Sequence, residues 1–253
     1  MTATTGIPTD APRSVLRVSG PEANDFLQNL VTNDLGKLKD GLVYAALLTP
    51  QGKYRADFFL VPRPDGAILI DVAEPLAADL TRALTLYKLR AKVELEQTDI
   101  TVSRGIGPAP EGAYADPRDP SMGWRGYDGQ PGQDADWSAL RVAACVPESG
   151  VELTPDSFIL ETGFERLNGV DFKKGCYVGQ EVTARMKHKT ELRKGLVPVE
   201  VTGAAPVGTA IESGGKPAGT LYTQSGGRGL AYLRFDRAEG EMRAGEATLR
   251  RIS

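Results

Sequence analysis

A cysteine in a short basic segment is the residue of this sequence best suited to chemistry. Cys176 follows Lys173, Lys174 and Gly175, and residues 178–186 have the apolar spacing of a short helix that begins just after the cysteine. Neighbouring lysines and a helix N-terminus both stabilise a thiolate, so we expect the pKa of Cys176 to fall below about 8.5. The sequence therefore predicts a thiol that is reactive at neutral pH. The alternative is a small cysteine that fills a gap in the core.

Other familiar catalytic and metal sites lack the residues they need. Cys145 lies in an apolar stretch and is expected to be an inert core residue. Two cysteines and one histidine, His188, cannot supply four Cys or His ligands, so no metal site is predicted. A Ser/His/Asp triad would have to use His188, which lies between two lysines and is expected to be solvated. No P-loop is present, and prolines break the one G-x-G-x-x-G candidate at Gly105.

The charge of the chain is unevenly distributed. The 253 residues carry a net charge of −3, but residues 172–195 hold seven Lys or Arg against two Glu, which gives +5 in this segment and leaves −8 elsewhere. This distribution favours an anionic ligand or partner bound at one place, and direct nucleic-acid binding is not expected. The sequence lacks a run of about 18 apolar residues and the layout of a signal peptide. We therefore expect no membrane contact and a cytoplasmic location.

The first hundred residues have the periodicities of a mixed sheet and helix layer. Alternating and apolar stretches predict strands, one pair of which forms a hairpin around Pro50-Gln-Gly-Lys, and two stretches have the 3.6-residue repeat of amphipathic helices. The predicted strands are 14–19, 43–48, 54–61, 67–72, 93–97 and 100–103, all in one sheet, and the predicted helices follow Ser19 and Pro75.

The rest of the chain divides into a loop, a mixed segment and a β-rich end. Residues 105–132 contain twelve Gly or Pro, which predicts a long ordered loop. A buried strand is expected at 139–146 and a helix from Phe158 to about Leu167. From Lys194 onward, short β segments separated by Gly-rich turns predict a compact barrel or sandwich. We place a boundary near Arg193, with domains at 1–192 and 193–253.

The segment Lys174-Gly-Cys-Tyr-Val-Gly-Gln-Glu181 resembles the signature of the YgfZ family. These are folate-binding proteins related to the T-protein (aminomethyltransferase) of the glycine cleavage system and to the mitochondrial factor that helps assemble [4Fe–4S] clusters. The resemblance covers most of residues 14–196. It includes Phe26-Leu-Gln-Asn-Leu-Val-Thr-Asn-Asp34, Leu47-Leu-Thr-Pro-Gln-Gly-Lys53 and Asn168-Gly-Val-Asp-Phe172.

The resemblance implies an α+β, T-protein-like folate-binding fold followed by a small C-terminal β-barrel. It implies that tetrahydrofolate, or a one-carbon-substituted folate, lies in a central cavity. Asp57 matches the aspartate that faces the reactive nitrogens of the folate, and Glu161 matches the glutamate that holds the pterin, whose amino/imino edge suits a carboxylate. The remaining residues assigned to the cofactor are Tyr177, Gln180, Glu181 and Arg185. Lys174, Arg185 or Lys187 is a candidate for holding the glutamate tail, and the alternative is a solvated basic face.

Three functions remain open at this point. The first is a folate-dependent accessory protein for iron–sulfur enzymes, in which Cys176, Lys174 and Asp57 form the working site and client or assembly proteins are the partners. The second is a folate-dependent aminomethyl transferase, which needs Asp57 but has no evident use for Cys176. The third is a tRNA-binding or tRNA-modification accessory, suggested by the basic segment and by Trp124 and Tyr127 in the long loop.

Overall fold

The computed structural model describes residues 12–189 and 191–252, which fold into two compact units. The sheet unit comprises residues 12–135 and 164–184, and the barrel unit comprises residues 136–163 and 185–252. Each unit is therefore built from two separate stretches of the chain. Among the described residues, no helix has both the length and the apolar character needed to cross a membrane.

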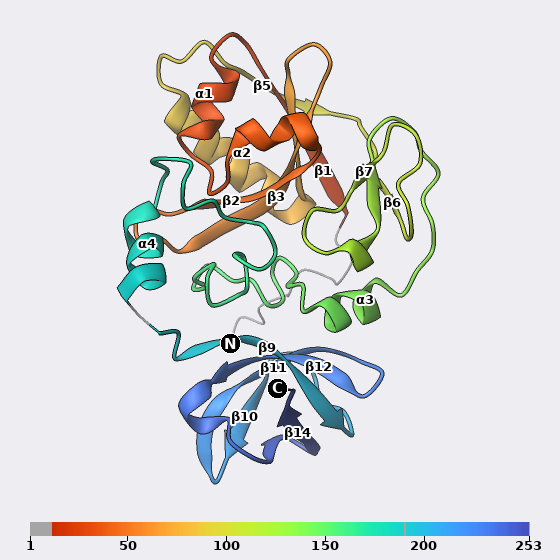
Figure 1. Ribbon diagram of the computed structural model, residues 1–253, viewed down its shortest axis with the longest axis vertical. Coiled ribbons are helices and arrows are strands. Elements are labelled where there is room, and N and C mark those ends of the chain that lie inside the picture. The colour runs from red at the N-terminus through yellow and green to blue at the C-terminus, as the bar shows by residue number, and fades with distance from the viewer. Residues whose placement is uncertain (1–11, 190, 253) are drawn as a thin grey trace. The chain divides into compact units, whose positions relative to one another are not determined.

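A five-stranded antiparallel sheet forms the centre of the sheet unit, and it confirms the hairpin and most of the predicted strands (Figure 1). A 3₁₀-helix over Leu35–Asp40 precedes the hairpin. In spatial order the strands are β2 (Val43–Leu48), β3 (Tyr54–Pro62), β4 (Ile68–Ala73), β1 (Arg13–Ser19) and β5 (Glu94–Thr98). The two predicted helices are α1 (Ala23–Gln28) and α2 (Glu74–Lys88).

The two faces of this sheet are covered by different kinds of side chain. Because successive side chains of a strand point to opposite faces, Ala56, Phe58 and Leu60 of β3 join an apolar core with α1 and α2. Asp57 and Phe59 of the same strand point to the other face. That face packs against the segment that follows β5, which the sequence predicts as a long ordered loop.

This long segment is ordered and carries a small sheet of its own. Strands β6 (Ser103–Gly105), β8 (Trp124–Gly126) and β7 (Tyr114–Ala115) pair in that order, and a 3₁₀ turn covers Pro120–Met122. The strand predicted at 100–103 in the main sheet is wrong, because only Ser103 is extended and it pairs with β8. Gly105 allows this pairing, since a Cβ there would lie 2.4 Å from the Trp124 ring.

The barrel unit contains the closed barrel expected for the C-terminal residues (Figure 1). The sequence did not predict the short strand over Met242–Ala244 or the 3₁₀ turn over Phe235–Arg237. In barrel order the strands are β10 (Thr209–Ser213), β11 (Lys216–Ser225), β12 (Arg228–Arg234), β9 (Lys194–Thr202), β14 (Ala247–Arg251) and β13 (Met242–Ala244).

Two predictions for the mixed segment are wrong. Residues 139–146 are not a strand, because helix α3 (Trp137–Ala144) begins where the Asp136 side chain accepts a hydrogen bond from the Ala139 backbone N–H (2.8 Å). Residues 158–167 form successive turns instead of a helix. Gly163, whose φ is +83°, interrupts any helical path there.

Candidate functional site

The chain around Cys176 is tied to the outer edge of the sheet by Thr32. The Thr32 hydroxyl donates to the Gly169 carbonyl oxygen (2.7 Å) and accepts from the Ala46 backbone N–H of β2 (2.9 Å). The Thr32 carbonyl in turn accepts from the Asp171 N–H (2.9 Å). Thr32 therefore links the segment that leads to Cys176 to strand β2.

Asn33 makes a second attachment beside the first. Its side-chain amide donates to the carbonyl oxygens of Tyr44 (2.8 Å) and Asn168 (2.6 Å). Lys37 adds an ion pair to Asp171 (2.7 Å). Two segments quoted for the resemblance, residues 31–34 and 168–171, thus fold against each other, which gives both a structural reason for their residue types.

Lys174 holds the next part of the loop. Its ammonium group donates to the carbonyl oxygens of Gln28, the last residue of α1, and of Val31, three residues further on (2.6 Å for Val31). Its positive charge interacts favourably with the partial negative charge at the C-terminal end of α1. Burial lowers the pKa of Lys174 to about 8, against an opposing effect of the nearby Asp34 and Asp171 carboxylates. Lys174 therefore positions the loop through α1 as well as placing a cation near Cys176.

The far end of the loop rests on the hairpin turn between β2 and β3. Gly179 has a φ of +81°, and a Cβ at this position would lie 2.6 Å from the Thr49 carbonyl oxygen. Gly52 in the turn has a φ of +76°, and its Cβ would lie 2.8 Å from Val182 Cβ. Only glycine allows so close an approach in these backbone conformations. The two glycine-containing motifs therefore pack directly on each other.

Cys176 itself is exposed on this loop, as predicted for a reactive thiol. Helix α4 (Gln180–Lys189) forms, but it begins at Gln180, so Tyr177, Val178 and Gly179 separate it from the cysteine. The effect of a helix dipole is confined to the first turn, so α4 is a poorer source of thiolate stabilisation than the sequence predicts. Of the two predicted cofactor residues that open α4, Gln180 is half-buried and Glu181 is exposed.

Tyr177 contributes an unsatisfied polar group next to the cysteine. Among the described residues, its hydroxyl is a buried side-chain oxygen without a hydrogen-bond partner. Burial raises the pKa of Tyr177, against a smaller opposing effect of the Thr183 side chain. The Lys174 ammonium lies 5.3 Å from the centre of the Tyr177 ring. A buried hydroxyl of this kind carries a desolvation cost that a bound ligand can offset.

Asp57 lies on the other face of the sheet, held between two tyrosines. Its Oδ2 accepts from the Tyr44 hydroxyl (2.9 Å) and its Oδ1 from the Tyr54 hydroxyl (2.7 Å), and its side chain is buried. Burial and the Asp57 charge raise the pKa of Tyr44 well above its ordinary value. Tyr44 therefore remains a protonated donor, and the two tyrosine hydroxyls together fix the orientation of the carboxylate.

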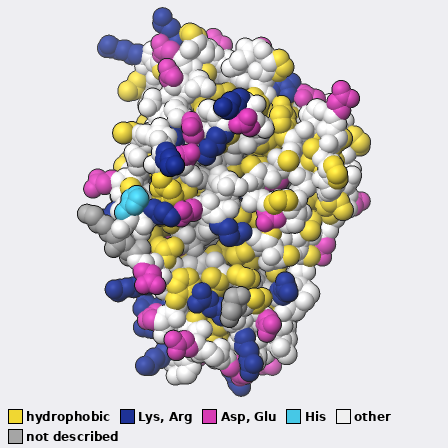
Figure 2. All heavy atoms as spheres, viewed as in Figure 1, with side chains coloured by type: hydrophobic (Ala, Val, Ile, Leu, Met, Phe, Trp, Pro, Cys, Tyr) yellow, Lys and Arg dark blue, Asp and Glu magenta, His cyan; other side chains and the backbone are white. Residues whose placement is uncertain are grey.

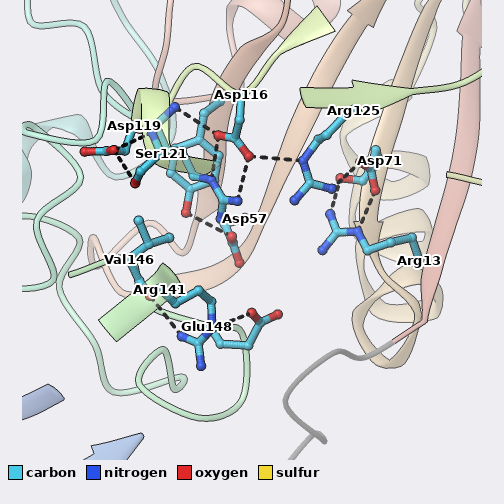
Figure 3. Close-up of polar contacts among 12 residues, drawn as sticks. Arg13, Asp57, Asp71, Asp116, Asp119, Ser121, Arg125, Arg141, Val146 and Glu148 are labelled. Carbon is cyan, nitrogen blue, oxygen red and sulfur yellow. Dashed lines mark hydrogen bonds and ion pairs between the residues drawn. The ribbon is translucent and has the colours of Figure 1, made fainter. Parts of the chain in front are cut away.

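A set of buried ion pairs, which we call the Arg–Asp network, covers the same face of the sheet (Figure 3). Arg125 lies between Asp71 (3.2 Å) and Asp116 (3.3 Å), and its guanidinium carbon is 3.9 Å from the centre of the Phe59 ring. Burial alone would raise the pKa of Asp71, but Arg13 and Arg125 outweigh it and lower the value. The members of the network are Arg13, Asp71, Asp116, Arg118, Arg125 and Tyr127.

Two of the predicted site residues, Glu161 and Arg185, belong to the barrel unit. Glu161 is buried, and its Oε2 accepts from the Tyr232 hydroxyl of β12 (2.5 Å) and lies 3.8 Å from the Lys194 ammonium. Burial and the Glu161 charge raise the pKa of Tyr232. Arg185 is exposed on α4.

The structure thus brings together some predicted residues and adds others. Lys174, Cys176 and Tyr177 share one loop, whereas Asp57 lies on the sheet face that carries the Arg–Asp network. The residues that sequence reasoning did not assign to the site are Thr32, Asn33, Tyr44, Gly52 and Tyr54. The sequence could have indicated Thr32, Asn33 and Gly52, because they lie in segments that carry the family resemblance.

Comparison with solved structures identifies the fold. The glycine cleavage system aminomethyltransferase T from Bartonella henselae superposes with a TM-score of 0.75 over 95% of this chain and 83% of that chain, at 12% identity. The fold is therefore aminomethyltransferase-like. Residues 193–252 match the family model described as CAF17, C-terminal beta-barrel domain. The domain limits 1–192 and 193–253 remain a prediction. In the structure, residues 136–163 belong to the same compact unit as the barrel.

Sequence relatives define the family within this class. The mitochondrial iron–sulfur cluster assembly factor IBA57 of Mus musculus is 30% identical, and that of Homo sapiens is 31% identical. Each match covers 91% of this chain and 78% of the relative. A homologue from Mycosarcoma maydis is 32% identical over 74% of this chain and 55% of its own length. The chain belongs to the IBA57 family of aminomethyltransferase-like proteins.

Proposed function

We propose that the protein is an iron–sulfur cluster assembly factor that works through the Cys176 thiol. The names of its relatives support the assembly role. The observation that carries the thiol role is an exposed cysteine on a loop that is held at both ends, by Thr32, Asn33 and Lys174 on one side and by Gly179 on the other. Such a loop keeps the sulfur in a fixed position while leaving it accessible.

The proposed step is a ligand exchange without a change of oxidation state. The Cys176 thiol loses its proton to solvent as its sulfur binds an iron of the cluster, which is the cargo, and the bond between that iron and a thiolate of the delivering protein breaks, so that this thiolate takes up a proton from solvent. A client thiolate then forms a bond to the same iron, the Cys176–iron bond breaks, and the cluster passes on. Lys174 is near enough to offset the charge of the thiolate between these steps. The partners on this proposal are client or assembly proteins.

The test is complementation of cells that lack the protein. Wild type is expected to restore the activity of a [4Fe–4S] enzyme such as aconitase, and Cys176→Ala is expected to lose most of this rescue at equal protein levels. Cys145→Ala is the matched control, because Cys145 is partly buried at the end of α3 in the barrel unit. Full rescue by Cys176→Ala would remove the thiol role and leave the family assignment intact.

We also propose that the protein binds tetrahydrofolate or a one-carbon-substituted folate. The chemistry of the residues fits such a ligand. Asp57 and Glu161 are buried carboxylates that suit the amino/imino edge of a pterin, and the Tyr177 hydroxyl is buried without a partner. Gln180, Glu181 and Arg185 are further proposed contacts, and Arg185 is exposed.

Calorimetric titration of the purified protein with tetrahydrofolate tests this ligand. Asp57→Asn and Glu161→Gln are each expected to weaken binding by about tenfold, which corresponds to the loss of one charge-assisted hydrogen bond. Glu148→Gln serves as the control carboxylate in the barrel unit. Binding that is unchanged in both site variants would contradict the proposed folate contacts.

An aminomethyl transferase activity is the second candidate, and the aminomethyltransferase-like fold favours it. Formation of methylene-tetrahydrofolate from an aminomethyl donor by the purified protein would establish this activity. Folate binding without turnover would count against it. A role in binding tRNA, the third alternative, predicts salt-sensitive tRNA binding through the basic segment. A cytoplasmic location likewise remains a proposal.

A further inference from the structure

The barrel unit carries a basic cleft that the proposed function does not use. The cleft has a volume of about 820 Å³ and lies where the start of β9 meets the end of β12 and the 3₁₀ turn after it. Its walls combine three arginines with two carboxylates and two apolar side chains, so the lining has a net positive charge. They are formed by Glu191, Leu192, Arg193, Arg234, Phe235, Asp236 and Arg251.

Two of the three arginines are available to a ligand. Within the described residues, neither Arg193 nor Arg251 makes an ion pair, and both are exposed. Arg251 stacks on the Phe235 ring, with its guanidinium carbon 4.6 Å from the ring centre. Stacking holds the plane of a guanidinium while its N–H groups stay free for a carboxylate, so this arginine is arranged for bidentate binding.

The third arginine already has an internal carboxylate partner. Arg234 pairs with Asp236 (3.3 Å), and Arg237 lies 3.9 Å from the same carboxylate. The Arg234 hydrogen bond holds the pKa of Asp236 below its ordinary value. Asp236 is exposed, so a carboxylate from outside can compete with it for Arg234. The lining therefore contains two carboxylates, Asp236 and Glu191, and Asp236 already occupies Arg234 as a carboxylate of a ligand would.

The size and shape of the cleft favour an extended ligand over a compact anion. A second cleft of about 560 Å³, lined by Glu241, Arg250 and other residues, shares Arg251 with the first. Cationic groups are thus spread along two adjoining clefts and do not converge on one point. Leu192 and Phe235 supply apolar surface in the larger cleft. On the face drawn in Figure 2, basic and apolar side chains of the barrel also lie side by side.

We propose that this cleft is a docking site for a short acidic peptide segment of a partner protein. Carboxylates of the segment pair with Arg193, Arg234 and Arg251, and an apolar side chain packs against Leu192 and Phe235. A protein with a net charge of −3 repels acidic partners in general, so a local basic cleft gives such a partner a single preferred place and orientation. The docking does not depend on Cys176.

The test is calorimetric titration of the full chain with a capped Glu-Glu-Leu-Glu-Glu peptide at low and moderate salt. The same peptide with Gln in place of Glu, and inorganic phosphate, are the comparison ligands. We expect binding of the Glu peptide alone, with an affinity that falls as salt increases. Arg251→Gln is expected to weaken binding by about tenfold. Arg243→Gln, an exposed arginine of β13 outside the cleft lining, is the matched control and should leave it unchanged.

A gain of affinity provides the sharper test. Asp236→Asn removes the internal competitor for Arg234 and is expected to tighten peptide binding by about threefold, whereas Glu246→Gln, outside the cleft lining, should not. A purely structural role for these residues predicts no such gain. Absence of peptide binding, equal loss in Arg251→Gln and Arg243→Gln, or phosphate binding as tight as that of the peptide would each overturn the proposal.

Discussion

The Arg–Asp network and the Cys176 loop both gather polar side chains in the sheet unit, but they differ in how completely those groups are satisfied. In the network, Asp71 is fully buried and accepts from Arg13 (2.6 Å), Arg125 (3.2 Å) and the Tyr127 hydroxyl (2.9 Å). In the loop, the Cys176 thiol is exposed, and the buried Tyr177 hydroxyl has no hydrogen-bond partner within residues 12–189 and 191–252.

The difference separates buried groups that are fully paired within the fold from a buried hydroxyl that is not. A buried charge is tolerated only when it is paired, so a network with every charge paired is accounted for by folding alone. A buried hydroxyl without a partner lowers stability, and binding of a ligand can recover that loss. Substitutions in the network should therefore change stability most, and substitutions in the loop should change function most.

The largest effect is expected from Asp71→Ala. This change leaves the Arg13 and Arg125 guanidinium groups without their shared carboxylate on a buried face, which is expected to lower the free energy of unfolding by about 3–5 kcal/mol. Chemical denaturation followed by circular dichroism measures it. Arg63→Met, which removes the exposed ion pair of Arg63 with Asp128, should cost less than about 1 kcal/mol. Equal losses in the two variants would contradict the distinction between buried and exposed pairs.

The parts of the fold that could be predicted are those with one-dimensional periodicity. The hairpin and α2 follow from alternation and the 3.6-residue repeat, and both are present. The segment 139–146 was misjudged because its apolar run fits a strand or a buried helix equally well. The capping residue Asp136 would have indicated the helix. Apolar spacing could not predict the turns at 158–167, because the positive φ of Gly163 interrupts a helix there whatever the spacing of the apolar residues.

The residues of the candidate site could be predicted only where they lie together in one sequence motif. Cys176 is singled out by the residue types of its own segment, and the structure adds that it is exposed. The Arg–Asp network does not, since Arg125 and Asp71 are 54 residues apart and nothing in the local sequence of either specifies the other. The tyrosine partners of Asp57 were missed for the same reason, although Tyr54 is only three residues away along β3.

A smaller effect, with a particular pH dependence, is expected from Lys174→Met. Loss of the two charge-assisted hydrogen bonds to the end of α1 should lower the free energy of unfolding by about 1.5–3 kcal/mol at pH 7. In the folded protein the pKa of Lys174 is about 8, below the ordinary value of 10.5. The unfolded chain therefore binds more protons between these values, and Lys174 makes stability rise with pH from about 8 upward.

Parallel measurement of unfolding free energy at pH 7.0, 8.0 and 9.0 in wild type and Lys174→Met tests this dependence. The cost of the substitution should grow over this range, because only wild type gains stability as Lys174 loses its proton. Lys37→Met is the control for a more exposed lysine of the same region. A cost that is constant with pH would show that Lys174 titrates at its ordinary value.

The smallest effect, and the most direct test of the comparison, comes from one substitution made in both regions. Tyr127→Phe removes a hydroxyl that donates to Asp71 (2.9 Å), so it should lower the free energy of unfolding by about 1 kcal/mol or more. Tyr177→Phe removes a buried hydroxyl that has no partner in the described part of the chain, so stability should stay the same or rise by up to about 1 kcal/mol. If the Tyr177 hydroxyl serves a ligand, Tyr177→Phe should also weaken tetrahydrofolate binding, and Tyr127→Phe should not. Loss of stability in both variants would mean that Tyr177 belongs with the network, as a residue that holds the fold.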